Sequence, residues 1–188
     1  MRCWSDYGPL SAVNRTSVIS DRLIFEAIVR THQGAVRAFL RRLTGNHALA
    51  DDLAQDCFMR ALSHMNDLQD PTKAKAWLFT TAYRIFIDHY RKTKRRADLT
   101  PNPNIFSPDI SHAVPSAGLG LDLSKAMADL SPDMRACLML VLSEGLTHAE
   151  AAGVTGLPLG TVKSHIARGR KTLQTALSAY LEKADNNA

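Results

Sequence analysis

The chain has 188 residues, of which 45% are hydrophobic and only 6% aromatic, and its net charge is +5 at pH 7. This length suits one ordinary domain or two small ones, and the abundance of Leu, Ala, Val and Ile favours helices over strands. The positive charge is compatible with a polyanionic partner. Cys3, Cys57 and Cys137 are too far apart in sequence to form a metal-binding pair, and no apolar run has the length of a signal or membrane segment. We therefore expect a cytoplasmic protein with no direct membrane insertion, no metal and no other cofactor.

The first part of the chain, residues 20–96, repeats apolar residues at helical spacing throughout. Gly45 and Asn46 interrupt this pattern, and Asn46 is well placed to cap the helix that follows it. A loop over residues 66–76 then leads into a second long helical stretch, WLFTTAYRIFIDHYRKTKRR. The pattern predicts a compact group of helices for this part.

The composition changes abruptly between residues 97 and 120. This segment contains four of the eight prolines and neither Lys nor Arg, so we predict an extended and flexible linker. A long surface loop within one domain is the alternative, although loops of this length are uncommon in compact domains. We expect the linker to let the parts on either side of it move independently.

A second helical part extends over residues 121–181. Ser131 followed by Pro132 is typical of a helix start, and Thr147 with Glu150 has the spacing of a capping box that opens a short helix. That helix is followed by a turn containing Gly and Pro, and then by a further helix. We therefore predict an all-α protein of two small helical domains joined by a proline-rich linker, with a helix-turn-helix in the second domain.

The last helix of this motif lies within GLPLGTVKSHIARGRKTL, a stretch that contains no acidic residue. Val162 and Ile166 fall on one side of it, so the opposite side is free to enter a major groove. We predict phosphate contacts for the cations at its edges and base contacts for the outward-pointing side chains. The residues predicted to contact DNA are Thr161, Lys163, Ser164, His165, Arg168, Arg170 and Lys171. The alternative is an amphipathic surface helix whose basic residues only face water.

A second basic segment, RKTKRR, closes the first helical part with five cations in six residues, directly after an aromatic-containing helix. Cations interleaved with aromatic rings suit single-stranded nucleic acid, because cations follow the backbone while rings stack on unpaired bases. A solvated helix end stabilised by the helix dipole is the alternative, and Trp77 and Phe86 fit the core better than a contact surface. Together, the two basic patches predict a protein that binds DNA where the duplex opens.

An acidic helix face is the third feature. Asp51, Asp52, Gln55 and Asp56 lie opposite the apolar stripe of their helix. The helix dipole accounts for Asp51 and Asp52 in the first turn but not for Asp56, which lies further in. Because such a face cannot contact DNA in a DNA-binding protein, we predict a protein partner with a basic surface.

These segments resemble a bacterial sigma factor of the extracytoplasmic-function (ECF) group, which keeps only regions two and four of larger sigma factors. The stretch ADDLAQDCFMRAL is similar to the part of region two that docks on RNA polymerase, and WLFTTAYRIFIDHYRKTKRR is similar to the part that melts and reads the −10 element. The stretch LSPDMRACLMLVLSEGLTHAEAAGVTGLPLGTVKSHIARGRKTL resembles the whole of region four, which reads the −35 element. The resemblance covers both helical parts in the expected order.

The resemblance implies a role for individual residues, with residues 20–96 as region two and residues 121–181 as region four. It implies contacts with core polymerase by Asp52, Gln55 and Asp56. It places the −10 contacts at Lys73, Lys75, Tyr83, Arg84, Arg91, Lys92, Arg95 and Arg96, and the −35 contacts at the seven residues named above for the last helix. It also implies capture of a flipped −10 base by the loop 66–76. The sequence departs from the family pattern at Tyr83, where Arg is common, at Arg84, where Asn is usual, and at His165, where Arg is frequent.

A promoter-recognition subunit that binds core RNA polymerase and promoter DNA, under the control of an anti-sigma factor, follows from the resemblance. A LuxR-type transcription regulator is the alternative, because GTVKSH also resembles that class, but the first part lacks the strand–helix alternation of a receiver domain. An enzyme is not expected, because the sequence contains no nucleophile–base pair and no phosphate-binding glycine loop.

Overall fold

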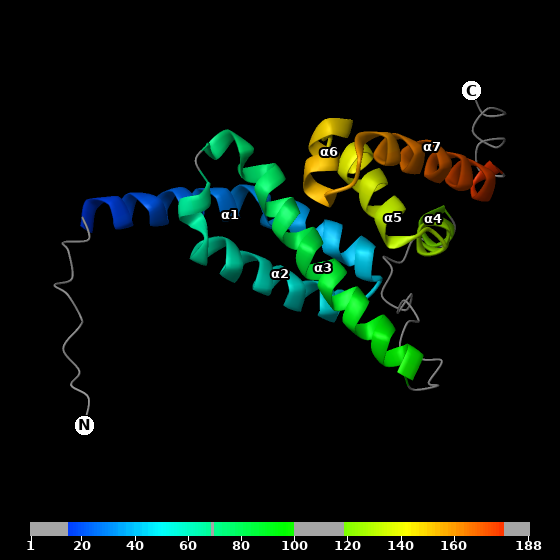
Figure 1. Ribbon diagram of the computed structural model, residues 1–188, viewed down its shortest axis with the longest axis horizontal. Helices are drawn as coiled ribbons and strands as arrows, with labels where there is room; N and C mark the ends of the chain where they lie inside the picture. Colours follow the sequence, from blue (N-terminus) through cyan, green and yellow to red (C-terminus); the bar gives the residue numbers. More distant parts are fainter. Residues whose placement is uncertain (1–14, 69, 100–118, 179–188) are drawn as a thin grey trace.

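The computed structural model describes residues 15–68, 70–99 and 119–178 (Figure 1). In these residues all regular structure is helical, which confirms the predicted all-α class. The α-helices are α1 (Arg15–Thr44), α2 (His47–Ser63), α3 (Ala74–Leu99), α4 (Leu119–Ala128), α5 (Pro132–Leu138), α6 (His148–Thr155) and α7 (Leu159–Ala176). Two 3₁₀ turns, η1 (Met65–Asp67) and η2 (Pro71–Lys73), precede α3, and a π-helical turn, η4 (Met139–Ser143), continues α5. None of the described helices is both long and apolar enough to cross a bilayer.

The first half of the molecule is a three-helix unit in which α2 and α3 pack on the long α1. The Asn46 side chain accepts a hydrogen bond of 2.9 Å from the Leu49 amide and so caps α2, as predicted. The rings of Phe39 and Phe79 meet edge to face, with centroids 5.1 Å apart, and both side chains are fully buried. This contact fixes α3 against α1 in the centre of the unit.

The second half is formed by α4 to α7, and its helix starts follow the predicted capping chemistry. Ser131 accepts from the Met134 amide at the start of α5. At the start of α6, Thr147 and Glu150 form the complete capping box. The Thr147 hydroxyl accepts a 3.2 Å hydrogen bond from the Glu150 amide, and the Glu150 carboxylate accepts a 2.8 Å hydrogen bond from the Thr147 amide. Gly156 ends α6 with φ = 71°, a conformation that favours glycine because it has no Cβ.

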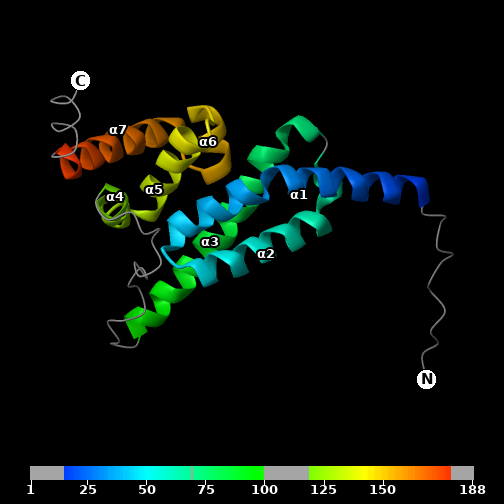
Figure 2. The same cartoon turned by 180° about the vertical axis from the view of Figure 1, so that it is seen from behind.

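The two halves are in contact, and their buried residues form one continuous hydrophobic cluster. Helix α6 packs on α3, and α5 also contacts α1, while Figures 1 and 2 show α2 on the edge remote from α6 and α7. In this structure the two halves are packed on one another, and their independent movement about the linker stays a prediction. The physical reason for this packing is that α3 packs on α1 and α2 in the first half and also on α6 in the second half. Contact between the two halves therefore removes further apolar surface from water.

The ends of the predicted linker, 97–120, are helical. Helix α3 continues to Leu99, because the first proline of the linker is Pro101 and the residue before a proline is disfavoured in a helix. Helix α4 already begins at Leu119. The remainder of the linker, residues 100–118, lies outside the described residues, so its predicted flexibility stays a prediction.

Candidate nucleic-acid interface

The helix-turn-helix consists of α6, a turn at residues 156–158, and α7. Val162 and Ile166 on the inner side of α7 are buried, and α7 packs on α4, α5 and α6. The opposite side of the helix faces solvent. The geometry therefore presents α7 as a recognition helix, with its first turn free of capping side chains and its amide groups available to phosphates.

The seven predicted DNA contacts on α7 differ in exposure. Five of them are exposed and two, Thr161 and His165, are half-buried; the exposed ones are Lys163, Ser164, Arg168, Arg170 and Lys171. The Ser164 hydroxyl donates to the Gly160 carbonyl, so its oxygen keeps lone pairs for an incoming donor. His165 points outward less than the sequence predicted, since its Nδ1 is enclosed and has no hydrogen-bond partner.

Gly169 determines how closely α7 approaches α5. It is buried, and a Cβ placed on it would lie 2.5 Å from Leu138 Cδ1 and 3.2 Å from Met134 Cγ. Even alanine would therefore displace the Leu138 side chain or the helix itself. Because Gly169 lies between Arg168 and Arg170, this close contact also positions the two cations relative to the rest of the second half. No local sequence pattern indicates this contact, because Leu138 and Gly169 lie in different helices.

The basic end of α3 extends beyond α2 in both ribbon views (Figures 1 and 2). The predicted −10 contacts in this part of the helix are all exposed, namely Arg84, Arg91, Lys92, Arg95 and Arg96. Trp77 is half-buried and Phe86 is buried, in agreement with their expected place in or beside the core. The cations are thus available to a nucleic-acid backbone, and most of the aromatic surface is not.

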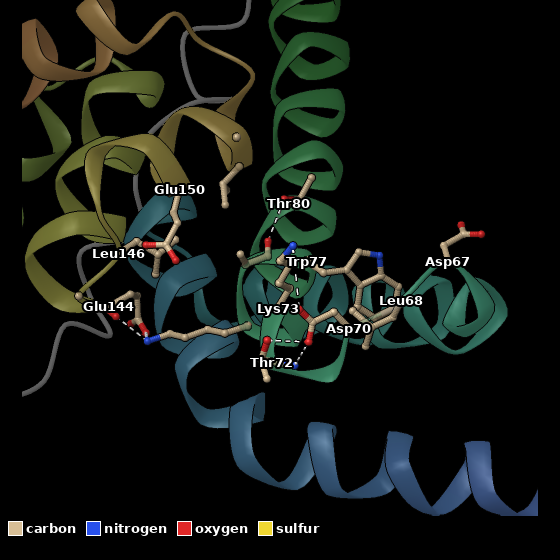
Figure 3. Close-up of a pocket in the computed structure, with 15 residues that line it drawn as sticks. Asp67, Leu68, Asp70, Thr72, Lys73, Trp77, Thr80, Glu144, Leu146 and Glu150 are labelled. Carbon is tan, nitrogen blue, oxygen red and sulfur yellow. Dashed lines mark hydrogen bonds and ion pairs between the residues drawn. The ribbon is translucent and has the colours of Figure 1, made fainter.

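The loop before α3 borders a hollow of about 670 Å³ between the two halves (Figure 3). Asp70 caps the start of η2, because its carboxylate accepts hydrogen bonds from the Thr72 amide and hydroxyl. These bonds lower the pKa of the Asp70 carboxyl. Lys73 is exposed and lies 4.0 Å from Asp70. Figure 3 shows Trp77 and Asp70 on the first half and Glu144 and Glu150 on the second half, all lining this hollow.

Two of the predicted −10 residues are engaged by the second half of the chain. Lys75 donates to the backbone carbonyl of Glu144 and lies 3.5 Å from its carboxylate. Tyr83 is buried, with 6% of its surface exposed, and its hydroxyl donates a 2.7 Å hydrogen bond to Asp133. Burial and this bond raise the pKa of Tyr83. In this arrangement Tyr83 is not available to DNA, whereas Lys75 is paired with Glu144 but keeps 37% of its side chain exposed.

Arg135 is a further residue that sequence reasoning missed. Its guanidinium donates to the carbonyl of Leu43 near the end of α1, to that of Ala128, the last residue of α4, and to that of Leu130 just beyond it. It thereby joins the C-terminal ends of two helices from different halves, where carbonyls lack intrahelical partners. Burial lowers the pKa of this guanidinium. No local motif indicates these contacts, because Leu43 and Arg135 are 92 positions apart.

The acidic face of α2 is arranged as predicted. Asp52, Gln55 and Asp56 are exposed on the same side of the helix, away from buried Leu53 and Cys57. Asp51 differs from them, because its carboxylate accepts bonds of 3.1 and 3.3 Å from Arg41. The acidic face open to a partner therefore consists of Asp52, Gln55 and Asp56.

Comparisons with known proteins agree with this geometry. Residues 28–96 match the family model for sigma-70 region 2, and residues 120–173 match that for sigma-70 region 4. The chain is 33% identical over 154 residues to the ECF RNA polymerase sigma factor EcfG of Rhodopseudomonas palustris, covering 81% of this chain and 83% of that protein. It is 31% identical over 169 residues to the ECF sigma factor SigE of Mycolicibacterium smegmatis, covering 87% of this chain but only 65% of that protein.

Among solved structures, the chain resembles the sigma factor RpoE of Bartonella quintana in complex with the anti-sigma factor NepR, with a TM-score of 0.73 and 33% identity. That likeness covers 82% of this chain and 96% of the other. The match of the first half to sigma region 2 leaves the LuxR-type alternative without support. The chain therefore belongs to the extracytoplasmic-function sigma factors and is an alternative sigma factor.

Proposed function

We propose that this sigma factor binds core RNA polymerase in the cytoplasm through the exposed acidic face of α2 and directs it to promoters read by α3 and α7. Residues 20–96 then act as region two and residues 121–181 as region four, joined by the linker 97–120. The observation that carries this proposal is the solvent-facing basic side of α7, whose apolar side is buried in its own half. A helix held in this way is suited to major-groove readout.

The division of roles within the proposed interface follows from exposure and chemistry. The exposed cations of α3 suit the backbone of a melted strand, because arginine and lysine donate charge-assisted hydrogen bonds to phosphate oxygens. On α7, Lys163, Arg170 and Lys171 suit phosphate contacts, while Ser164, His165 and Arg168 suit base edges. The −10 base pocket is proposed at the hollow beside Trp77, which the loop 66–76 borders.

Control by an anti-sigma factor is also part of the proposal. It is supported by the likeness to RpoE of Bartonella quintana, whose solved structure is a complex with the anti-sigma factor NepR. An anti-sigma factor that binds this chain would compete with core polymerase if it covered the acidic face of α2.

The experiment that tests the function is run-off transcription with purified core polymerase, this protein and a library of genomic promoters. Initiation at a small set of promoters sharing two elements is the expected result. Absence of initiation above that of core polymerase alone, with a folded protein, would contradict the proposal.

A further inference from the structure

We propose that His165 reads one base pair of the −35 element as a hydrogen-bond donor, through Nε2 alone, and so selects guanine at that position. This inference rests on the proposed function, because it deepens the role of α7 there from contact with base edges to the readout of one particular base. The structural basis is that the two ring nitrogens of His165 lie in different surroundings.

His165 stands at the border between the buried and the exposed sides of α7. Val162 and Ile166 on its inner side are buried, whereas Ser164 and Arg168 on its outer side are exposed. Because successive residues of a helix are about 100° apart, the imidazole lies along one edge of α7. The ring is half-buried, so only part of it can reach a groove.

The two ring nitrogens of His165 differ in access. Nδ1 is enclosed by protein and has no hydrogen-bond partner. Nε2 is not enclosed in this way, and no hydrogen bond joins it to the described part of the chain. A base in the groove can therefore reach Nε2 and cannot reach Nδ1.

The enclosed position of Nδ1 decides which nitrogen of the neutral ring carries the proton. A neutral imidazole has one N–H donor and one acceptor nitrogen. A proton on Nδ1 would create an enclosed N–H without an acceptor, which is rarer in folded proteins than an enclosed acceptor without a donor. The hydrogen-bonding surroundings therefore assign the proton to Nε2. His165 then presents one N–H to DNA and no acceptor.

A single donor distinguishes the bases by the atoms that they expose in the major groove. Guanine presents two acceptors, N7 and O6, and one N–H directed between them can be shared by both. Adenine presents one acceptor beside an amino donor, and thymine one acceptor beside a methyl group. Cytosine presents only an amino donor, which leaves the Nε2 proton without a partner. The expected order of preference therefore begins with guanine and ends with cytosine.

Ser164, the residue before His165, has the opposite character. Its hydroxyl proton is used in a 2.9 Å hydrogen bond to the Gly160 carbonyl, so its oxygen is left to accept a hydrogen bond from a base. The two adjacent side chains thus offer DNA one donor and one acceptor. A change at His165 should alter the preference at one base position and leave the position read by Ser164 as it is.

The test compares His165→Gln with His165→Asn in the full-length protein. The glutamine amide reaches as far from the backbone as Nε2, whereas the asparagine amide ends at the level of Nδ1. The two variants therefore place the same chemical group at the two ring positions, and His165→Ala gives the baseline without the contact. Each protein selects from a randomised duplex DNA library, and the bound molecules are sequenced. Circular dichroism checks that the variants keep their helical content.

The wild-type protein should prefer guanine over cytosine about fivefold or more at one position, and His165→Ala should lose this preference. His165→Asn should behave like His165→Ala to within about twofold, because its amide does not reach the base. His165→Gln should keep a preference at the same position but shift it from guanine towards adenine, because a glutamine amide pairs with N6 and N7 of adenine. Preferences at the other positions should not change.

An equal loss of binding to every sequence in all the variants would overturn the inference, because His165 would then contact a phosphate. Retention of the wild-type preference by His165→Asn and its loss in His165→Gln would also overturn it, since Nδ1 would then be the reading nitrogen. The same holds if the wild-type protein shows no guanine preference that His165→Ala removes. The selection contains no polymerase, so the proposed function fails separately if the wild-type protein does not initiate transcription with core polymerase.

Discussion

Tyr83 in α3 donates a 2.7 Å hydrogen bond to Asp133 in α5, a residue fifty positions further along the chain. The bond joins the two halves of the molecule and orients a buried ring whose polar end would otherwise lack a partner. Its contribution can be measured without altering the shape of the core, because phenylalanine keeps the ring.

We expect Tyr83→Phe to lower the free energy of unfolding by about 1 to 3 kcal/mol, as for a hydrogen bond to a charged group. Urea denaturation followed by circular dichroism measures this difference. Tyr90→Phe, on the same helix but half-buried, serves as the comparison. An unfolding free energy of Tyr83→Phe equal to that of the wild type would show that the bond does not persist in solution.

Docking on core polymerase should depend on the acidic face of α2. Asp52→Lys combined with Asp56→Lys should weaken binding to core polymerase strongly, because like charges would meet at the proposed interface. The melting temperature should change little, since both side chains are exposed. Co-purification with core polymerase is the measurement, and Glu26→Lys is the exposed control at another site. Wild-type recovery of the double variant would place the docking surface elsewhere.

Readout of the −35 element should separate the residues of α7 by role. Lys163→Ala should weaken transcription about equally on all −35 variants and reduce the salt dependence of promoter binding, as for a phosphate contact. Arg168→Ala and His165→Ala should instead change which bases are preferred, by about 1 to 3 kcal/mol for a lost bidentate contact. A randomised −35 library transcribed by each holoenzyme measures both effects. A uniform loss for Arg168→Ala and His165→Ala would assign them to the phosphates.

The close packing of α7 on α5 should make Gly169 intolerant of substitution. Gly169→Ala should lower the free energy of unfolding by about 1 to 3 kcal/mol, because the added Cβ overpacks the contact with Leu138. Gly34→Ala is the matched control, since Gly34 lies in the interior of α1 with nothing within 4 Å of its Cβ position. The control should be stabilised by up to about 1 kcal/mol through helix propensity. Thermal denaturation of both variants decides between overpacking and a general effect of alanine.

The buried cysteines should be unreactive in the folded protein. Burial raises the pKa of Cys57 and of Cys137 from 9.0 to about 12. In a Cys3→Ser variant, iodoacetamide at pH 8 should therefore label no thiol until denaturant is added. Because the folded state holds these thiols neutral, it gains no stability from ionisation, and the free energy of unfolding should fall as the pH rises from about 9 towards 12. Rapid labelling of the native protein would show that the helices open at these sites.

Local chemistry in the sequence determined where helices begin and end. Asn46, Ser131 and the Thr147–Glu150 box cap the helices that the pattern predicted, because a cap depends only on residues within one turn. The same holds for Gly156, whose left-handed conformation needs no distant partner. The outward faces of α2 and α7 were predictable for a related reason, since helical periodicity alone separates their apolar and polar sides.

Only the tertiary structure decided which of the predicted site residues are accessible. Lys75 and Tyr83 have the sequence character of DNA contacts, yet Glu144 and Asp133 engage them from the other half of the chain. The need for glycine at position 169 likewise becomes visible only in the folded chain, where a Cβ would collide with Leu138. The physical reason is that periodicity and capping are properties of neighbours within a few residues. The pairing of two helix faces depends instead on the total surface and charge that the whole chain can bury at once.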